Sequence, residues 1–294
     1  MPEKTFTEKL RALLVRYPER AISWPEIWWR DLTAKDRVMP NFIIIGAQRC
    51  GTTSLYDYLC QHPQIIPSPV KELFYFDDYY TRPDTWYRSF FPRKREVEKL
   101  EKGLIARVIT GEASPSYFFH PYAARRIKET LPDVKLLLVL RDPIERAYSH
   151  YNHIRRLNRE PLSFEEAIEK EEERIKDDVD KLAKDENYKA DKRRDYSYLS
   201  RGYYARQLKE WLKYFSLEQL LVIQSEEFYR ETPKVYNEIV EFLGLNSYTL
   251  PVFEAKNALK YAKMAPETKE KLKSYFAPKN EELYELLGKR FDWQ

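Results

Sequence analysis

A glycine-rich turn separates an apolar run from an expected helix near the start of the chain. The run covers residues 41–45, and the turn begins at Gly46 and holds Gly51 after four intervening residues. Such a turn directs backbone N–H groups and the positive end of a helix dipole to one point, where a phosphate binds. The sequence therefore predicts a phosphate-binding loop over residues 46–53, although short glycine motifs also occur in turns that bind no ligand.

The loop differs from that of a nucleoside triphosphatase. In the pattern G-x-x-x-x-G-K-[ST] a lysine follows the second glycine, whereas Thr52 follows Gly51 in this chain. A cation occurs inside the loop instead, at Arg49. From there a guanidinium can reach the bridging oxygen of a phosphate anhydride and stabilise the charge that develops on a leaving group. The loop therefore points away from ATP hydrolysis.

A second cationic position follows another apolar run, residues 135–140. Arg141 comes directly after this run, where a magnesium-dependent nucleotidase would place an acidic metal ligand. The expected helix after Pro143 carries Arg146, Ser149 and His150 on neighbouring turns. Arginine, hydroxyl and backbone groups would then bind a second phosphate without a divalent metal. The alternative is a local arrangement, in which Arg141 pairs with a neighbouring acid and Ser149 only caps the helix.

These motifs require an alternating series of strands and helices. We predict strands at 41–45, 135–140 and 220–224, each followed by a helix, at 53–61, 144–157 and 233–243. This alternation favours parallel pairing and an α/β three-layer sandwich with a central parallel sheet. We expect a helical N-terminal arm over residues 1–39 and a single domain over residues 40–294. The highly charged residues 163–194 are predicted to form a solvated helix and a mobile loop that cover or flank the site.

Composition limits the partners and the compartment. The 51 Lys and Arg residues nearly balance the 47 Asp and Glu residues, so the net charge of +4 does not predict a nucleic-acid partner. The only two cysteines, Cys50 and Cys60, do not suggest a disulfide framework, and we expect a cytoplasmic location. No apolar run is long enough for a transmembrane segment. The aromatic residues 24–29 favour packing on the domain and leave weak peripheral contact with a membrane open.

Two segments resemble the motifs of sulfotransferases that use 3′-phosphoadenosine 5′-phosphosulfate (PAPS). Residues 40–55 (PNFIIIGAQRCGTTSL) resemble the family's 5′-phosphosulfate loop, and residues 138–151 (LVLRDPIERAYSHY) resemble its 3′-phosphate motif. The similarity extends over about residues 40–294 and is greatest to heparan-sulfate type N- and 3-O-sulfotransferase domains and their bacterial relatives. It implies a P-loop NTPase-like sulfotransferase fold, PAPS as sulfuryl donor, and 3′,5′-adenosine bisphosphate (PAP) as product, without a metal.

The resemblance also implies a set of donor contacts. Arg49 stands where many members carry a catalytic lysine, and arginine keeps that charge with a different reach and geometry. Arg141 and Ser149 would bind the 3′-phosphate. The full set of expected donor contacts is Gln48, Arg49, Cys50, Gly51, Thr52, Thr53, Ser54, Arg141, Ser149, Tyr203, Lys260, Tyr261 and Lys263.

On the acceptor side, residues 70–77 (VKELFYFD) resemble the family segment whose glutamate is the general base, which corresponds to Glu72. Residues 111–118 (GEASPSYF) resemble another active-site segment. The expected acceptor contacts are Lys71, Phe74, Glu112 and Ser114. The chain departs from heparan-sulfate enzymes at Ala113, where they commonly carry lysine, and at Phe74, where some carry histidine.

The sequence therefore predicts an enzyme that transfers a sulfuryl group from PAPS to a hydroxyl or amine, with Glu72 as base and Arg49 as stabiliser of the leaving group. A saccharide is the expected acceptor. Two alternatives stay open at this point. In the first, the acceptor is a small-molecule or lipid alcohol. In the second, the chain is a nucleotide-binding module that has lost catalysis.

Overall fold

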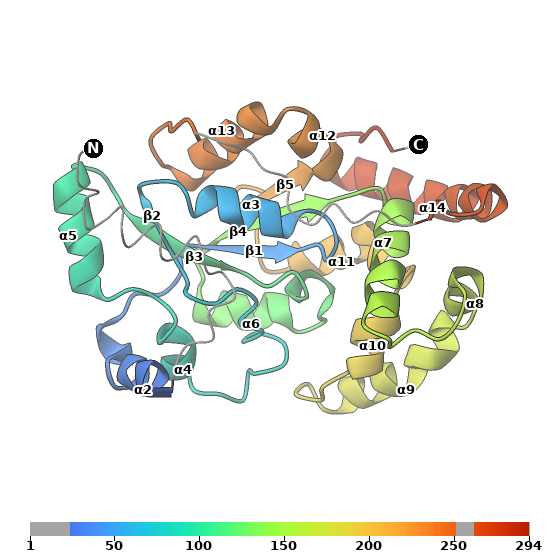
Figure 1. The fold of residues 1–294 in the computed structure, drawn as a ribbon, viewed down its shortest axis with the longest axis horizontal. Coiled ribbons are helices and arrows are strands. Elements are labelled where there is room, and N and C mark those ends of the chain that lie inside the picture. Colours follow the sequence, from blue (N-terminus) through green and yellow to red (C-terminus); the bar gives the residue numbers. More distant parts are fainter. Residues whose placement is uncertain (1–23, 251–261, 294) are drawn as a thin grey trace.

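Five parallel strands form the centre of the molecule (Figure 1). The structure is a computed structural model that describes residues 24–250 and 262–293. The strand order is β2-β3-β1-β4-β5. The strands are β1 (Phe42–Gly46), β2 (Ile65–Pro67), β3 (Ile109–Ala113), β4 (Lys135–Leu140) and β5 (Leu220–Gln224). Every β1 residue is buried, as the β-branched run predicts for a strand covered on both faces.

The helices lie on both faces of this sheet, which confirms the predicted three-layer α/β sandwich. In Figure 1, α3 and α13 lie on one face and α6 and α11 on the other. The helices of the main body are α3 (Thr52–Leu59), α4 (Asp84–Arg88), α5 (Lys94–Leu104), α6 (Ala123–Thr130), α7 (Pro143–Arg156), α11 (Tyr204–Trp211), α12 (Ser225–Arg230), α13 (Thr232–Leu243) and α14 (Pro266–Leu287), with short 3₁₀ turns η2 (Tyr117–Phe119) and η3 (Ser200–Gly202).

Two strands were absent from the sequence-based prediction. β2 has only three residues, and β3 contains Thr110, Gly111 and Glu112 rather than an apolar run, although all five of its residues are buried. Gly111 permits close packing in β3, because a Cβ atom there would lie 2.4 Å from the ring of Phe42 on the neighbouring strand. The glycine and the buried polar residues removed the apolar pattern by which a strand is recognised.

The strand order creates a binding position between β1 and β4. From β1 the chain continues to β2 and β3 on one side, and it then crosses to β4 and β5 on the other. Ligands of open parallel sheets bind at such a reversal, outside the carboxyl ends of the strands. The segments that follow β1 and β4 carry Arg49 and Arg141, so the topology places both predicted motifs at this edge.

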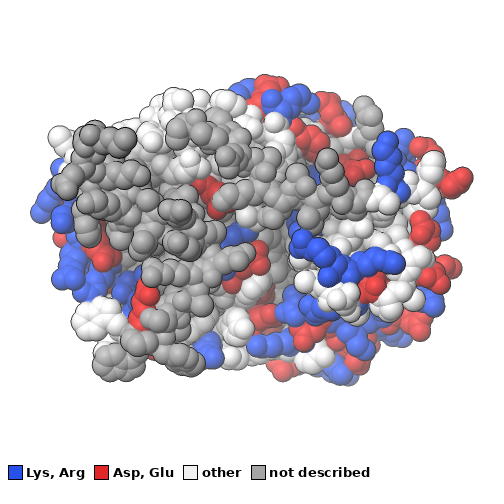
Figure 2. All heavy atoms as spheres, viewed as in Figure 1, with Lys and Arg blue, Asp and Glu red and all other residues white. Residues whose placement is uncertain are grey.

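The charged residues 163–194 form helices beyond this edge, α8 (Phe164–Glu169), α9 (Glu171–Lys184) and α10 (Asp191–Tyr196) (Figure 1). On the face drawn in Figure 2, cationic and anionic side chains are interspersed over the end of the molecule that carries these helices. Neither sign of charge dominates this part of the surface.

The described part of the predicted arm contains α2 (Trp24–Leu32) and η1 (Ala34–Asp36). Arg37 donates a hydrogen bond to the Phe91 carbonyl oxygen (2.6 Å), which ties the arm to the main body. The Trp29 side chain is 53% exposed, with the Arg93 guanidinium 5.1 Å from its ring centre. The division into an arm and one domain stays a prediction, since residues 1–23 lie outside the described residues. Over residues 24–250 and 262–293, no helix is both long and apolar enough to cross a membrane.

Candidate active site

The predicted phosphate loop joins β1 to α3 at the edge of the sheet. Ala47 N–H donates to the Val139 carbonyl oxygen (2.7 Å), which fixes the start of the loop on β4. Gly51 precedes the helix with φ = 97°, and a Cβ atom there would lie 2.7 Å from the Tyr229 hydroxyl. Only glycine fits this backbone and this space. The first N–H groups of a helix have no partner within the helix, so the start of α3 offers donors to an anion.

The two predicted donor motifs meet through a side-chain contact. Arg49 Nε donates to Ser149 Oγ (3.2 Å), although these residues are 100 positions apart in the chain. Ser149 lies on α7, which Asp142 caps by accepting a hydrogen bond from Ile144 N–H (2.8 Å). Arg141 pairs with Glu145 at 3.7 Å, as the local alternative predicted, and its side chain is 29% exposed. The structure therefore brings the loop cation beside the predicted 3′-phosphate residue.

A tyrosine that the sequence analysis did not select connects these motifs. The Tyr204 hydroxyl donates to the Arg141 carbonyl oxygen (2.9 Å) and lies 3.9 Å from Cys50 Sγ. Burial raises the pKa of Cys50 to about 11, so this thiol stays protonated at neutral pH and only its backbone is suited to an anion. The predicted Tyr203 instead donates its hydroxyl hydrogen to Glu282 on α14. Tyr203 and Tyr204 are adjacent in the sequence, which does not show which of the two side chains faces the donor loop.

The other expected donor contacts have different surroundings. Ser54 is buried and accepts a hydrogen bond from the Tyr229 hydroxyl (3.4 Å). Gln48 lines a small pocket together with the buried Arg146 and Arg201. Lys263 is exposed, and Lys260 and Tyr261 lie outside the described residues. Their roles in donor binding stay predictions.

The segment that carries the predicted base approaches the same loop. Lys71 Nζ donates to Thr53 Oγ1 (2.5 Å) and lies 3.4 Å from Glu72 Oε1. The Lys71 side chain is 15% exposed and the Glu72 side chain is 42% exposed. The Glu72 carboxylate is therefore open to an incoming acceptor. Lys71 was predicted to contact the acceptor, and the structure places its ammonium group on the donor loop.

Three non-glycine residues of this site have left-handed backbone conformations. The φ angles are 71° at Arg49, 62° at Glu72 and 51° at Phe74. Such conformations cost about 1–3 kcal/mol each and persist only where the surrounding structure imposes them. They concentrate at functional sites, so their occurrence at both predicted catalytic residues favours a functional role for this edge of the sheet.

Glu112 and Ser114 lie behind the segment that carries Glu72. Both side chains are fully buried, which differs from the predicted position in an acceptor-pocket wall. Glu112 accepts hydrogen bonds from the hydroxyls of Tyr87 (2.7 Å), Ser114 (2.7 Å) and Tyr117 (3.2 Å). Burial raises the pKa of this carboxyl to about 7, against the lowering effect of those three hydrogen bonds.

This raised pKa predicts how stability depends on pH. Between the ordinary glutamate pKa of 4.5 and about 7, folding takes up a proton at Glu112, so the free energy of unfolding decreases as pH rises. Glu112→Gln removes the contribution of this carboxyl to the pH dependence. Between about pH 4.5 and pH 8, the difference in free energy of unfolding between the variant and the unmodified chain should therefore shift by up to about 3 kcal/mol in favour of the variant. Urea unfolding across this range measures the difference. Glu98→Gln, at an exposed glutamate of α5, should leave the pH dependence of the free energy of unfolding unchanged. Parallel curves for Glu112→Gln and the unmodified chain would contradict the prediction.

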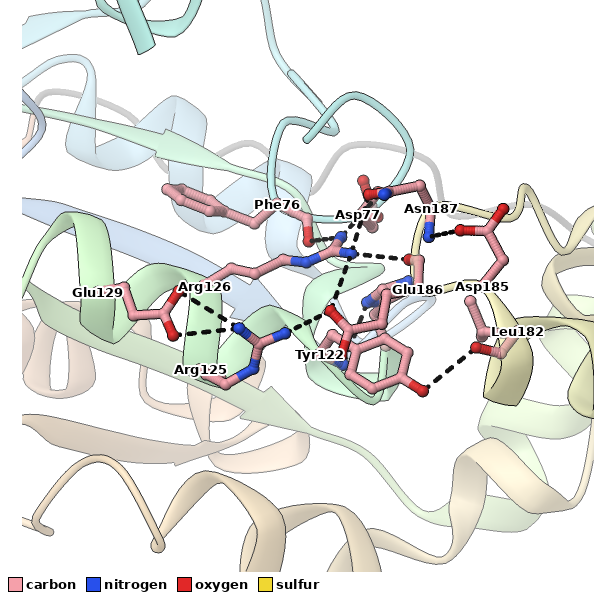
Figure 3. Close-up of polar contacts among 11 residues, drawn as sticks. Phe76, Asp77, Tyr122, Arg125, Arg126, Glu129, Leu182, Asp185, Glu186 and Asn187 are labelled. Atoms are coloured by element: carbon pink, nitrogen blue, oxygen red, sulfur yellow. Dashed lines mark hydrogen bonds and ion pairs between the residues drawn. The ribbon is translucent and has the colours of Figure 1, made fainter. Parts of the chain in front are cut away.

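A buried arginine connects the base-bearing segment with the charged helices (Figure 3). The Arg126 guanidinium donates to the carbonyl oxygens of Phe76 (3.1 Å) and Asp77 (3.3 Å), and also to the Glu186 carbonyl (2.7 Å) and to Asn187 Oδ1 (3.3 Å). Its side chain is 1% exposed. A second link joins Arg194 to Asp78 at 2.9 Å. The charged residues 163–194 therefore lie against the segment that follows Glu72, as the prediction of a flanking element requires.

His153, one helical turn after Ser149, was not among the predicted site residues. Burial and the nearby charge of Arg49 lower the pKa of this imidazole, with smaller effects of Arg156 and Arg159. These effects favour the neutral imidazole at physiological pH. The spacing of four residues on an expected helix was the signal that would have identified it.

Comparison with known proteins places this geometry in a family. Residues 39–281 match the family described as Sulfotransferase domain. The chain is 31% identical to the membrane-associated sulfotransferase kil1 of Dictyostelium discoideum, over 87% of this chain and 67% of that protein. It is also 31% identical to bifunctional heparan sulfate N-deacetylase/N-sulfotransferase 3 of Homo sapiens, over 90% of this chain and 31% of that protein.

A solved structure agrees with these matches. The crystal structure of a sulfotransferase from Alicyclobacillus acidocaldarius is 34% identical to this chain, with a TM-score of 0.66. The alignment covers 86% of this chain and 98% of that one. In contrast, the chain spans only 31% of the length of the bifunctional human enzyme.

Proposed function

Since the chain belongs to the sulfotransferase domain family and uses PAPS as its sulfuryl donor, we propose that it sulfates a hydroxyl or amine of a saccharide, with Glu72 as the general base. The observation that carries this proposal is the approach of residues 71 and 72 to the donor loop, through the contact between Lys71 Nζ and Thr53 Oγ1 (2.5 Å). The acceptor base and the donor loop thereby share one edge of the sheet.

The residues at this edge suit a donor with two separate anionic groups. The glycine turn and the first N–H groups of α3 would hold the 5′ phosphosulfate end. Arg141, just before α7, and Ser149, on the second turn of that helix, would hold the 3′-phosphate, which ATP lacks. When bound, PAPS supplies an activated sulfuryl group on a phosphate leaving group.

Each proposed catalytic residue then has one task. The Glu72 carboxylate accepts the proton of the acceptor hydroxyl or amine as that group attacks sulfur. Arg49 donates hydrogen bonds to the oxygen on which negative charge develops as the sulfur–oxygen bond breaks. The proton ends on Glu72, and the sulfuryl group ends on the acceptor.

The segment that follows Glu72 carries polar groups that suit a saccharide acceptor. Asp78 pairs there with Arg194 (2.9 Å), and the N–H of partly exposed Tyr79 donates to the Phe74 carbonyl oxygen (2.9 Å). Charged and hydrogen-bonding groups suit a sugar, which presents many hydroxyls. The human relative carries heparan sulfate in its name, as does heparan sulfate glucosamine 3-O-sulfotransferase 3A1 of Mus musculus, which is 26% identical over 87% of this chain.

A small-molecule or lipid alcohol is the second candidate acceptor. Partly buried Phe74 lies next to the base-bearing residues, and Ala113 occupies the position at which the heparan-sulfate enzymes commonly carry lysine. Both departures remove polar groups that a polyanionic sugar would use.

A transfer screen distinguishes the two acceptors. Purified protein is incubated with ³⁵S-labelled PAPS and one acceptor class at a time, namely oligosaccharides, sterols or phenols, and heat-denatured protein serves as the blank. We expect label in oligosaccharides. Incorporation into sterols or phenols alone would replace the saccharide proposal with the second candidate.

A further inference from the structure

The backbone that carries the proposed base is held from behind by three neighbouring residues. Glu72 N–H donates to the Ala113 carbonyl oxygen (3.0 Å), Phe74 N–H to Ser114 Oγ (3.3 Å), and Tyr75 N–H to the Tyr117 hydroxyl oxygen (2.9 Å). These bonds fix a segment with two left-handed residues, a conformation that an unsupported chain does not keep.

Two of these three acceptors depend on one carboxylate. The hydroxyls of Ser114 and Tyr117 both donate to Glu112, with oxygen–oxygen distances of 2.7 Å to Oε2 and 3.2 Å to Oε1. A hydroxyl that donates to a carboxylate has its lone pairs oriented outward and becomes a stronger acceptor. Glu112 therefore orients both hydroxyls toward the N–H groups of residues 74 and 75.

Glu112 is itself held rigidly. It lies in β3 opposite Ile43 of β1, in the interior of the sheet, and its side chain has no exposed surface. The network thus runs from the centre of the sheet through two hydroxyls to the backbone beside Glu72.

We infer that Glu112 is a positioning residue for the reaction: its carboxylate holds residues 72–75, through Ser114 and Tyr117, in the conformation that directs Glu72 to the donor loop. This inference rests on the proposed function, in which Glu72 is the base. It assigns Glu112 and Ser114 a role that requires no contact with the acceptor.

The chain offers a matched control. Tyr87 donates to the same Glu112 oxygen as Tyr117, but its hydroxyl has no hydrogen bond with the backbone of residues 72–75 among the contacts that the structure describes. Its ring stacks on Tyr75 at a centroid distance of 4.5 Å, and phenylalanine would keep this packing. Tyr87→Phe therefore weakens the carboxylate network without removing a hydroxyl that holds the base-bearing segment.

The test combines amide hydrogen exchange, calorimetry with PAP, and turnover of labelled PAPS with the acceptor that the screen identifies. In Glu112→Gln, Ser114→Ala and Tyr117→Phe, exchange at the Phe74 or Tyr75 amide should become at least about tenfold faster, while β1 and β4 stay protected. We expect kcat to fall by about 10-fold to 100-fold, since small misplacement of a reacting group is costly. The affinity for PAP and the acceptor KM should stay within about twofold. Tyr87→Phe should change both exchange at these amides and kcat by clearly less than Ser114→Ala does.

Uniformly faster exchange over the whole sheet, or equal losses of kcat in Tyr87→Phe and Ser114→Ala, would overturn the inference in favour of a general stabilising role. If Glu112→Gln does not fold, Ser114→Ala, which removes one hydroxyl, decides the question. A failure of the proposed function has a different signature. No acceptor would be sulfated, or Glu72→Gln would keep its turnover, while the exchange comparison would still report whether Glu112 holds the segment.

Discussion

Replacing Glu72 with glutamine should reduce kcat by about 10²-fold to 10⁴-fold, which is the usual contribution of a general base. The amide keeps the shape of the side chain but does not accept the acceptor's proton at neutral pH. The Glu72 side chain is 42% exposed, so the substitution removes no core packing. Affinity for PAP should stay within about twofold, because the donor-binding groups are untouched. Initial rates with labelled PAPS and titration calorimetry with PAP measure the two quantities.

Arg141→Ala is the contrasting variant. Loss of one charge-assisted contact should weaken PAP binding by about 10-fold to 100-fold. At saturating donor, kcat should then change less than in Glu72→Gln. Calorimetry with ATP and magnesium completes the comparison, because ATP lacks the 3′-phosphate. If Glu72→Gln kept full turnover, Glu72 would not be the base, and tighter binding of ATP than of PAP would contradict the assignment of Arg141 and Ser149.

Arg49→Ala should lower kcat by about 10²-fold to 10³-fold, the range seen when one donor to a developing charge is removed. Arg49 already contacts Ser149 at 3.2 Å across the donor-binding edge, so its guanidinium lies near the expected leaving group. Arg49→Lys should recover part of this loss, because lysine restores the charge with one compact donor group in place of a planar fork.

Single-turnover rates at saturating PAPS separate this effect from donor binding. A structural role for Arg49 would instead give a lowered melting temperature and no recovery in Arg49→Lys. Equal kcat values for Arg49→Ala and the unmodified chain would exclude Arg49 from stabilising the leaving group.

Continuous apolar runs were sufficient to locate the strands nearest the binding edge. The predicted strands at 135–140 and 220–224 coincide with β4 and β5, and the predicted strand at 41–45 differs from β1 by one residue at each end. β3 was missed because its burial depends on partners distant in the sequence. Gly111 fits beneath Phe42, and Glu112 is satisfied by three hydroxyls, and neither relationship is visible in a local pattern.

The site was predictable where a motif is contiguous and less so where side chains meet across the fold. The loop from Gly46 to Thr53 and the segment after β4 form as expected, since each depends on adjacent residues. The contacts of Lys71 with Thr53, and of Tyr204 with Arg141, depend on how separate helices and loops pack. A local sequence pattern does not contain this information.

The left-handed backbone at Arg49, Glu72 and Phe74 has a consequence for how this chain can change. Glycine or asparagine would adopt these conformations more readily, so selection for thermal stability alone would favour them at all three positions. Selection for turnover acts in the opposite direction at Arg49 and Glu72, because neither replacement supplies a cation or a base. Stability and activity are therefore opposed at Arg49 and Glu72, and a more heat-resistant form of the enzyme must gain its stability at other positions.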